Sequence, residues 1–341
     1  MPFDYSQNKI EDAIKIQDLC SSTHIKGLIN IDGGVYDNAD ITYPYSTKVG
    51  GYTVNVKGVH CMITKGSFHK VSQGGFNVDD FTLYDAYTEL VRYQKSFNIP
   101  LKEVHPERLE FGVNFNLKWS PRFVFDRVYS DNFRMYQDLS SYSKRTIGKL
   151  LTGVNGESEK KVKFYSKLLQ GVTKDNVFRF ENHYSKHSIL KSMGVNTLSD
   201  LFTLEVIETF AEDLLASWDK MVFLDDSLVL PSTLRKENHK RFETFSNPLK
   251  LSPVFEKGTD SFRVEKKKFN KLVKEYSVEN YHNKIRLEIE NKLQLMVYNY
   301  TQDPQSVQEF TDLYNDVSST KCSGFTTIGI ETIPSSFRSA S

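Results

Sequence analysis

Strict alternation of apolar and polar side chains over residues 109–117 leaves this stretch few alternatives to a β-strand. Every second residue is apolar, namely Leu109, Phe111, Val113, Phe115 and Leu117, and polar residues or glycine stand between them. Because successive strand residues point to opposite faces, the pattern predicts a strand with one buried and one polar face. Residues 162–167 and 177–181 alternate similarly. The short connection between them, 168–176 with Gly171 inside, predicts a hairpin.

The polar faces of these three strands carry the residue types that can cut a phosphodiester. Carboxylates hold a hard divalent cation, a phenolic oxygen attacks phosphorus, and Lys and Arg stabilise charge on phosphoryl oxygens. If the strands share a sheet in register, these groups meet on one face; the alternative is an ordinary half-exposed sheet whose wet face alternates charges. The residues are Glu110 and Asn114 on the first strand, Lys163, Tyr165 and Lys167 on the second, and Arg179 and Glu181 on the third.

The remaining chain predicts an α+β fold in which an antiparallel sheet precedes a helical region. Short β-branched runs separated by glycine pairs fill much of the first 115 residues, with a helix expected over about 80–97. From about His183 the pattern becomes helical: an amphipathic helix is predicted over 204–218 and a long basic one over about 262–300, broken near Ser277. We therefore expect a β-rich core with helices over 1–182, a helical DNA-binding or accessory region over 183–320, and a flexible tail over 321–341.

Charge is balanced overall but segregated along the chain. The 341 residues carry 44 Lys and Arg against 43 Asp and Glu. Residues 141–191 hold 11 basic and 4 acidic residues. Residues 196–226 hold 1 basic and 8 acidic residues, and residues 261–292 hold 9 basic and 5 acidic residues. Clustered basic charge is typical of a surface that binds a phosphate backbone, although a solvated face explains it equally well. Lys160, Lys161, Lys163, Arg179 and Asn114 are the residues expected to contact DNA.

Several classes of protein are disfavoured. No apolar run approaches the roughly 18 residues of a membrane span, and three distant cysteines do not suggest a disulfide framework. We therefore expect a soluble protein of a reducing compartment such as the cytoplasm. Neither a P-loop nor a His-x-His metal motif is present, and no organic cofactor is expected. His183 and His187 have zinc-ligand spacing, but without a third clear ligand they are interpreted as helix surface.

A series of motifs resembles the replication initiation proteins of bacterial phages and plasmids, of the filamentous-phage gene II/X and Rep_trans types. The series runs LEFGVN (109–114), VKFYSK (162–167), FRFE (178–181) and GVNTLSDL (194–201), and spans roughly residues 55–205. The resemblance implies a rolling-circle initiator with a Rep-type β-sheet nuclease core. Such an enzyme depends on Mg²⁺ or Mn²⁺, nicks one strand of origin DNA and stays attached through a 5′-phosphotyrosine.

The resemblance also assigns individual residues. Glu110 and Glu181 match the acidic, metal-binding positions, and Tyr165 and Lys167 match the Tyr and Lys of a Tyr-Asp-Lys motif. Ser166 stands where that motif has Asp, which removes one carboxylate. Tyr165 is the first choice for the nucleophile, because it shares a face with two lysines; the alternatives are Tyr142 and Tyr184.

Two other readings compete with the nuclease. A sequence-specific DNA-binding replication protein without nuclease activity is favoured by Ser166 and by the basic segment 266–268, with a helical pair around Gly194 against DNA. A phage structural or interaction protein is the third reading. The acidic stretch 200–226 is expected to dock on basic segments of the same chain or to bind a host replication factor. The sequence is also compatible with a homodimer.

Overall fold

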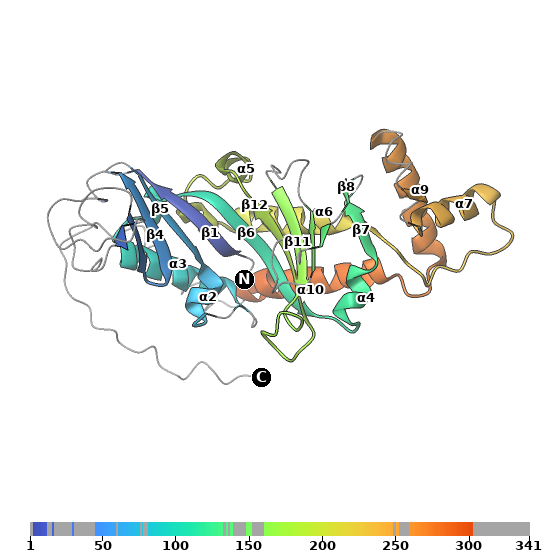
Figure 1. Cartoon of the computed structure of the whole chain (residues 1–341), viewed down its shortest axis with the longest axis horizontal. Helices are drawn as coiled ribbons and strands as arrows, with labels where there is room; N and C mark the ends of the chain where they lie inside the picture. The colour runs from blue at the N-terminus through green and yellow to red at the C-terminus, as the bar shows by residue number, and fades with distance from the viewer. Residues whose placement is uncertain are drawn as a thin grey trace.

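The computed structural model has the α+β architecture that the sequence predicts (Figure 1). It describes residues 3–11, 16, 29–30, 45–58, 61–75, 77, 81–131, 134–135, 137–138, 148–151, 160–247, 250–251 and 259–302. Within these ranges, no helix has both the length and the apolar composition needed to cross a bilayer.

A ten-stranded sheet forms the body of the molecule, and all its described pairings are antiparallel. The first strand of the chain does not lie at an edge but in the middle, between β5 and β6. In spatial order the strands are β2 (Ile29–Asn30), β3 (Tyr45–Val49), β4 (Tyr52–Gly58), β5 (Cys61–Ser67), β1 (Phe3–Ile10), β6 (His105–Asn116), β12 (Val177–Tyr184), β11 (Lys160–Ser166), β10 (Gly148–Leu151) and β9 (Gln137–Asp138).

The other described elements are shorter strands and helices. A second sheet has the order β13 (Met221–Phe223), β7 (Val128–Asp131) and β8 (Arg134–Met135). The helices are α2 (Phe68–Ser72), α3 (Leu83–Phe97), η2 (Leu101–Glu103), α4 (Pro121–Phe125), α5 (His187–Ser192), η5 (Leu198–Phe202), α6 (Leu204–Asp219), α7 (Lys236–Phe245), α9 (Thr259–Tyr276) and α10 (Tyr281–Gln302).

One face of the sheet is apolar and is covered by helices. Phe111 of β6 stacks on Phe210 of α6 with ring centroids 5.2 Å apart, and Phe180 of β12 packs edge-on against Trp218. Helices α6 and α10 lie behind β6, β12 and β11 in Figure 1, and Ile285 of α10 belongs to the same core. This leaves the polar residues of the central strands on the other face.

The strands, the hairpin and the helices predicted from periodicity are present. The alternating stretches lie in β6, β11 and β12, and the predicted basic helix is broken at 277–280 between α9 and α10. One expectation is wrong: the chain does not turn helical at His183. Strand β12 continues through Tyr184, which is paired with Leu109 and Lys160, and α5 begins only at His187.

The helices after residue 183 belong to two hydrophobic clusters. Helices α6 and α10 complete the core of the large sheet, whereas α7 and α9 pack on each other and on Val222 of β13 and Leu228. Figure 1 shows α7 and α9 at the end of the molecule far from β4 and β5. The predicted tail, 321–341, lies outside the described residues.

Helix α10 is fixed to α6 through a buried histidine, which makes stability depend on pH. The His282 ring stacks on Trp218 and its Nε2 lies 3.1 Å from the Trp218 carbonyl oxygen. Burial lowers the pKa of His282 to about 4, against about 6.5 when unfolded. A group whose pKa is lowered by folding stabilises the protein above its unfolded pKa, and this stabilisation is lost as the pH falls towards 4.

We expect the wild-type protein to lose about 2 kcal/mol more unfolding free energy than His282→Gln between pH 7 and pH 5. Urea denaturation at each pH measures this difference. The comparison cancels the other titrating groups, including buried His69, because both proteins carry them. Parallel pH profiles for the two proteins would contradict the prediction.

Candidate metal centre

The register of the central strands brings the predicted polar residues to one face. Lys163 of β11 lies opposite Glu181 of β12, which in turn lies opposite Gly112 of β6. Two residues along, Tyr165 is opposite Arg179, and Arg179 is opposite Asn114. The expectation that the three strands lie in one sheet with their polar faces together is confirmed.

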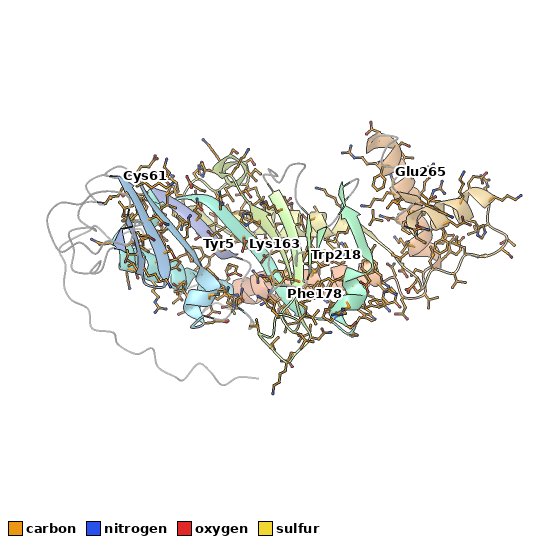
Figure 2. The ribbon with its side chains drawn as sticks, viewed as in Figure 1. Tyr5, Cys61, Lys163, Phe178, Trp218 and Glu265 are labelled. Carbon is orange, nitrogen blue, oxygen red and sulfur yellow. The ribbon has the colours of Figure 1, made fainter. Side chains whose placement is uncertain are left out.

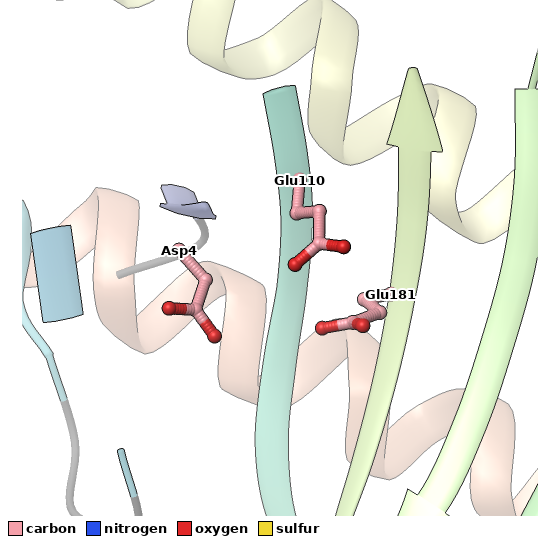
Figure 3. Close-up of side chains that lie close together, drawn as sticks. All are labelled: Asp4, Glu110 and Glu181. Atoms are coloured by element: carbon pink, nitrogen blue, oxygen red, sulfur yellow. The ribbon is translucent and has the colours of Figure 1, made fainter. Parts of the chain in front are cut away.

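A third carboxylate, which the sequence analysis did not identify, comes from the N-terminal strand. Asp4 of β1 lies beside Glu110 and Glu181 (Figure 3), and one ligand oxygen from each of the three lies within 4.8 Å of the others. Asp4 and Glu181 are buried and Glu110 is partly buried. Three carboxylates converging on one point are a donor set suited to Mg²⁺ or Mn²⁺.

An irregularity in β1 explains how Asp4 reaches this point. Phe3 pairs with Phe111 and Ser6 pairs with Leu109, so two residues of β1, Asp4 and Tyr5, stand opposite Glu110 alone. This is the two-against-one count of a β-bulge, which bends a strand and redirects its side chains. The bulge therefore places a carboxylate and a phenol together on the polar face.

Glycine at position 112 allows β6 and β12 to approach closely behind the carboxylates. A Cβ atom built on Gly112 would collide with the Cβ of Glu181 and with the Phe180 carbonyl oxygen. The glycine in the LEFGVN motif is thus needed for close backbone approach rather than for an unusual backbone conformation.

Two cations bridge the three carboxylates. Lys163 Nζ lies 2.5 Å from Glu110 Oε1 and 3.1 Å from Glu181 Oε1. Arg179, which has no exposed surface, donates from Nε to Glu181 Oε2 at 2.5 Å and lies 3.2 Å from Asp4 through Nη2. Three carboxylates therefore contact two cations directly.

The ion pairs outweigh burial in setting the charge of the carboxylates. Burial acts to raise the pKa of Glu181, but Lys163 and Arg179 lower it to about 2. The pKa of Asp4 is also lowered: burial acts to raise it, but the charge of Arg179 acts to lower it. Both groups are thus carboxylates at neutral pH, as cation ligands must be.

A second ring of polar groups holds these side chains in place. Asn77 donates from Nδ2 to Asp4 Oδ2 at 2.8 Å and accepts from Lys167 Nζ at 2.8 Å. Asn114 donates to the Asn77 carbonyl at 3.1 Å and accepts from Arg179 Nη1 at 3.0 Å. Because Lys167 is buried and close to Arg179, its pKa falls to about 8. The Asn77 carboxamide therefore links Lys167 to the carboxylate cluster.

His69 adds a neutral imidazole near the cluster. It is buried, stacks on Phe81 with ring centroids 4.7 Å apart, and feels the charges of Arg179 and Asp4. Burial first, and Arg179 second, lower the pKa of His69 to about 3. Its nitrogens are therefore uncharged near pH 7.

The structure distinguishes between the tyrosines considered for the nucleophile. Tyr165 lies on the polar face with Lys167 Nζ 4.9 Å from its ring centre, but it is buried, and burial and Glu181 raise its pKa well above 10. Tyr184 lies on the opposite, apolar face, where its hydroxyl donates to Asp213 at 2.6 Å. Tyr142 lies outside the described residues.

Tyr5 is a further phenol on the polar face that the sequence analysis did not consider. It is half-buried, and burial followed by the Glu110 carboxylate raises its pKa. Figure 2 labels Tyr5 and Lys163 over the middle of the sheet. It is more accessible than Tyr165 and follows Asp4 directly.

Of the basic residues expected to contact DNA, Lys160 does not join this face. It lies 2.6 Å from Asp213 of α6 and faces the Tyr184 ring on the side of the sheet that α6 covers. Lys161, the next residue along β11, is paired with His183 and stands with Lys163 on the polar face. Arg179 and Asn114 are buried within the cluster itself.

The two histidines with zinc-ligand spacing are not on a helix together. His183 is a strand residue whose Nδ1 lies 2.9 Å from Glu110 Oε1, at the border of the carboxylate cluster. His187 begins α5 and contacts the Pro106 carbonyl at 2.9 Å. The interpretation of His183 as helix surface is wrong, because pairing with Glu110 and Lys161 extends the strand through it.

Ser166 does not leave a gap among the carboxylates. It lies on the apolar side of β11, has no exposed surface, and its Oγ accepts from the Leu169 backbone at the start of the hairpin turn. The third carboxylate of the cluster is Asp4.

Comparison with solved structures gives a distant likeness, whereas the two other comparisons find nothing. No protein-family model and no curated protein matches the chain. The fold is similar to a solved structure titled as that of a rolling circle replication initiator protein from Geobacillus stearothermophilus. The identity is 14%, the TM-score is 0.37, and the match covers 69% of this chain and 89% of the other. That protein is of the class that the sequence motifs resemble.

Proposed function

We propose that this protein is a replication initiator that nicks one strand of DNA by metal-assisted attack of a tyrosine. The observation that carries the proposal is the convergence of Asp4, Glu110 and Glu181 on a sheet face that also holds two phenols and a lysine ammonium. The motif series of the sequence supports the same activity.

The residues present fit a hard divalent cation. All three donors are carboxylates, and Asp4 and Glu181 have lowered pKa values that keep them charged at neutral pH. Asp4, Glu110 and Glu181 would hold Mg²⁺ or Mn²⁺, which would polarise the scissile phosphate when bound.

The chain's own groups would bind the phosphate and transfer the proton. The tyrosine oxygen forms a bond to phosphorus, and the phenolic proton passes to a base. The bond from phosphorus to the 3′ oxygen breaks, and this oxygen leaves as a 3′ hydroxyl after taking a proton from water. Lys167, whose pKa of about 8 leaves part of it neutral, lies beside Tyr165 and is the proposed base there. Lys163, with 22% of its side chain exposed, would contact phosphoryl oxygens, whereas buried Arg179 holds Glu181 and Asp4.

The nucleophile is tested by separate Tyr165→Phe and Tyr5→Phe variants. We expect wild-type protein with Mn²⁺ to nick supercoiled plasmid carrying DNA from the protein's own replicon and to form an adduct on denaturing gels. Loss of the adduct in Tyr165→Phe, with its retention in Tyr5→Phe, would assign attack to Tyr165; the reverse would assign it to Tyr5. Peptide mapping of the adduct by mass spectrometry gives an independent assignment. An adduct that persists in the double variant would exclude both phenols.

One observation favours a second function, a DNA-binding replication protein without nuclease activity. Lys163 and Arg179 already bridge the three carboxylates, so the cluster is stable as an ion-pair network. DNA binding that survives EDTA, with no cleavage under Mg²⁺ or Mn²⁺, would support this function over the nuclease.

DNA is the partner that either function requires. The acidic residues of α6 divide into two groups: Asp213 and Asp219 pair with Lys160 and Arg286 of the same chain, while Glu205, Glu208 and Glu212 are exposed. The exposed group is the surface we propose for a host replication factor. A homodimer and a location in the bacterial cytoplasm stay predictions.

A further inference from the structure

Helix α9 carries a row of four exposed cations at one end of the molecule. Arg263, Lys267, Lys271 and Lys274 are spaced by four, four and three residues, which places them on one face of the helix. All four are exposed. We call these four residues the α9 basic row. Asp260, one turn before it, lies 3.6 Å from Arg263, while Glu265 is turned away and contacts Arg241 and Lys268.

The packing of α9 fixes which face carries the row. Phe262, Phe269 and Val273 point inwards, and Phe269 stacks on Phe245 of α7 with ring centroids 4.8 Å apart. Lys266 also points inwards, where its Nζ donates to the Asp219 and Lys220 carbonyls at the end of α6. The lysines at 266–268 therefore have different surroundings, and only Lys267 belongs to the row.

The dimensions of the row match the backbone of double-stranded DNA. Four residues of helix rise about 6 Å, so the row is about 16 Å long, which corresponds to about five base pairs. Its members are one arginine and three lysines, without an aromatic side chain among them, whereas surfaces that bind single strands usually offer rings on which bases stack. A helix with its side chains also has the width of the major groove.

We propose that the α9 basic row binds the phosphate backbone of duplex DNA, as a contact separate from the carboxylate cluster. The proposal rests on the proposed function, since it supplies the contact that holds an initiator on double-stranded DNA next to the strand it cuts. Figure 1 shows α9 beyond the end of the sheet, away from the strands that carry the carboxylates. In Figure 2 this end is marked by Glu265.

The test is a full-length variant with Arg263→Gln, Lys267→Gln, Lys271→Gln and Lys274→Gln. Fluorescence anisotropy with a 30-base-pair duplex is measured from 50 to 300 mM NaCl. We expect affinity at 150 mM to fall at least roughly 30-fold, and the slope of log K against log[salt] to become shallower by about 2 to 4, as for loss of two to four phosphate contacts. The exposed side chains leave folding unchanged, which circular dichroism checks.

A matched variant controls for net charge. Lys48→Gln, Lys57→Gln, Lys95→Gln and Lys102→Gln together remove the same charge from exposed positions on β3, β4, α3 and η2. We expect this control to keep the wild-type salt slope. An equal loss in both variants, an unchanged slope in the α9 variant, or no duplex binding by the wild-type protein would each overturn the proposal.

A cleavage assay separates this proposal from the proposed function. Metal-dependent cutting of a short single-stranded oligonucleotide needs the carboxylate cluster but not the row, so the α9 variant should cut it at the wild-type rate. If the α9 variant has a shallower salt slope for duplex binding and cuts the single strand at the wild-type rate, both proposals are supported. If neither the wild-type protein nor the α9 variant cuts DNA, but the salt slope of duplex binding is shallower for the variant, the nuclease is excluded. The α9 basic row then stands as a duplex contact.

Discussion

Glu181→Gln is expected to lower metal-dependent nicking at least about 1,000-fold, and to weaken Mn²⁺ binding at the cluster by a similar factor. The substitution keeps the shape of the side chain but removes a charge that faces both Lys163 and Arg179. It leaves Asp4 and Glu110 as the two carboxylates that would hold a cation. Nicking is followed on supercoiled plasmid, and Mn²⁺ binding is measured independently by electron paramagnetic resonance or calorimetry.

The matched control is Glu208→Gln on α6. This residue is exposed, so its loss removes the same charge without touching the cluster. Because removing Glu181 leaves Arg179 with one fewer partner, thermal denaturation must show that the variant is folded at the assay temperature. Wild-type nicking by folded Glu181→Gln would remove this residue from the mechanism.

Lys163→Met is expected to have opposite effects on metal binding and on stability. The ammonium contacts the carboxylates of Glu110 and Glu181, two of the three groups that would hold a cation, so the two positive charges would compete. Without the lysine, Mn²⁺ should bind at least about tenfold more tightly. In EDTA the variant should lose about 2 kcal/mol of unfolding free energy, because the carboxylates then repel one another. Added Mn²⁺ should bring the unfolding free energy back, so Mn²⁺ should stabilise the variant more than it stabilises the wild-type protein.

Lys161→Met is the control for this experiment. Lys161 lies two residues away on the same strand and the same side of the sheet, opposite His183. Its loss should leave both Mn²⁺ affinity and the stabilisation by Mn²⁺ close to those of the wild-type protein. If Lys163→Met binds Mn²⁺ no more tightly than Lys161→Met does, the ammonium does not compete for the metal position.

Alternation predicted the part of the site that lies on regular strands. In β6, β11 and β12 a strict period of two decided which side chains share a face, so Glu110, Lys163 and Glu181 could be grouped before any coordinates. Asp4 could not be grouped with them, because the bulge at Asp4 and Tyr5 breaks the period within a strand of eight residues. Pairing over about a hundred residues also leaves no local signal.

The helical half shows the same division between local and long-range information. The break between α9 and α10 follows from the residues around Ser277, and it was predicted. The inward position of Lys266 was not predicted. This residue lies in a run of three lysines, yet it points inwards and caps α6. A charge count treats the three lysines alike, whereas the contacts of α9 with α6 and α7 separate them.

The central position of β1 bears on the order in which the protein folds. During synthesis β1 emerges before both of its partners. β5 can pair with it after about sixty residues, but the other edge of β1 stays open until β6 is made. Such an edge can add strands from other chains. Since the pairing of β1 with β6 closes a loop of about a hundred residues, its formation should be slow. Aggregation should therefore be most severe for nascent chains that end between β5 and β6, and it should fall once β6 is complete.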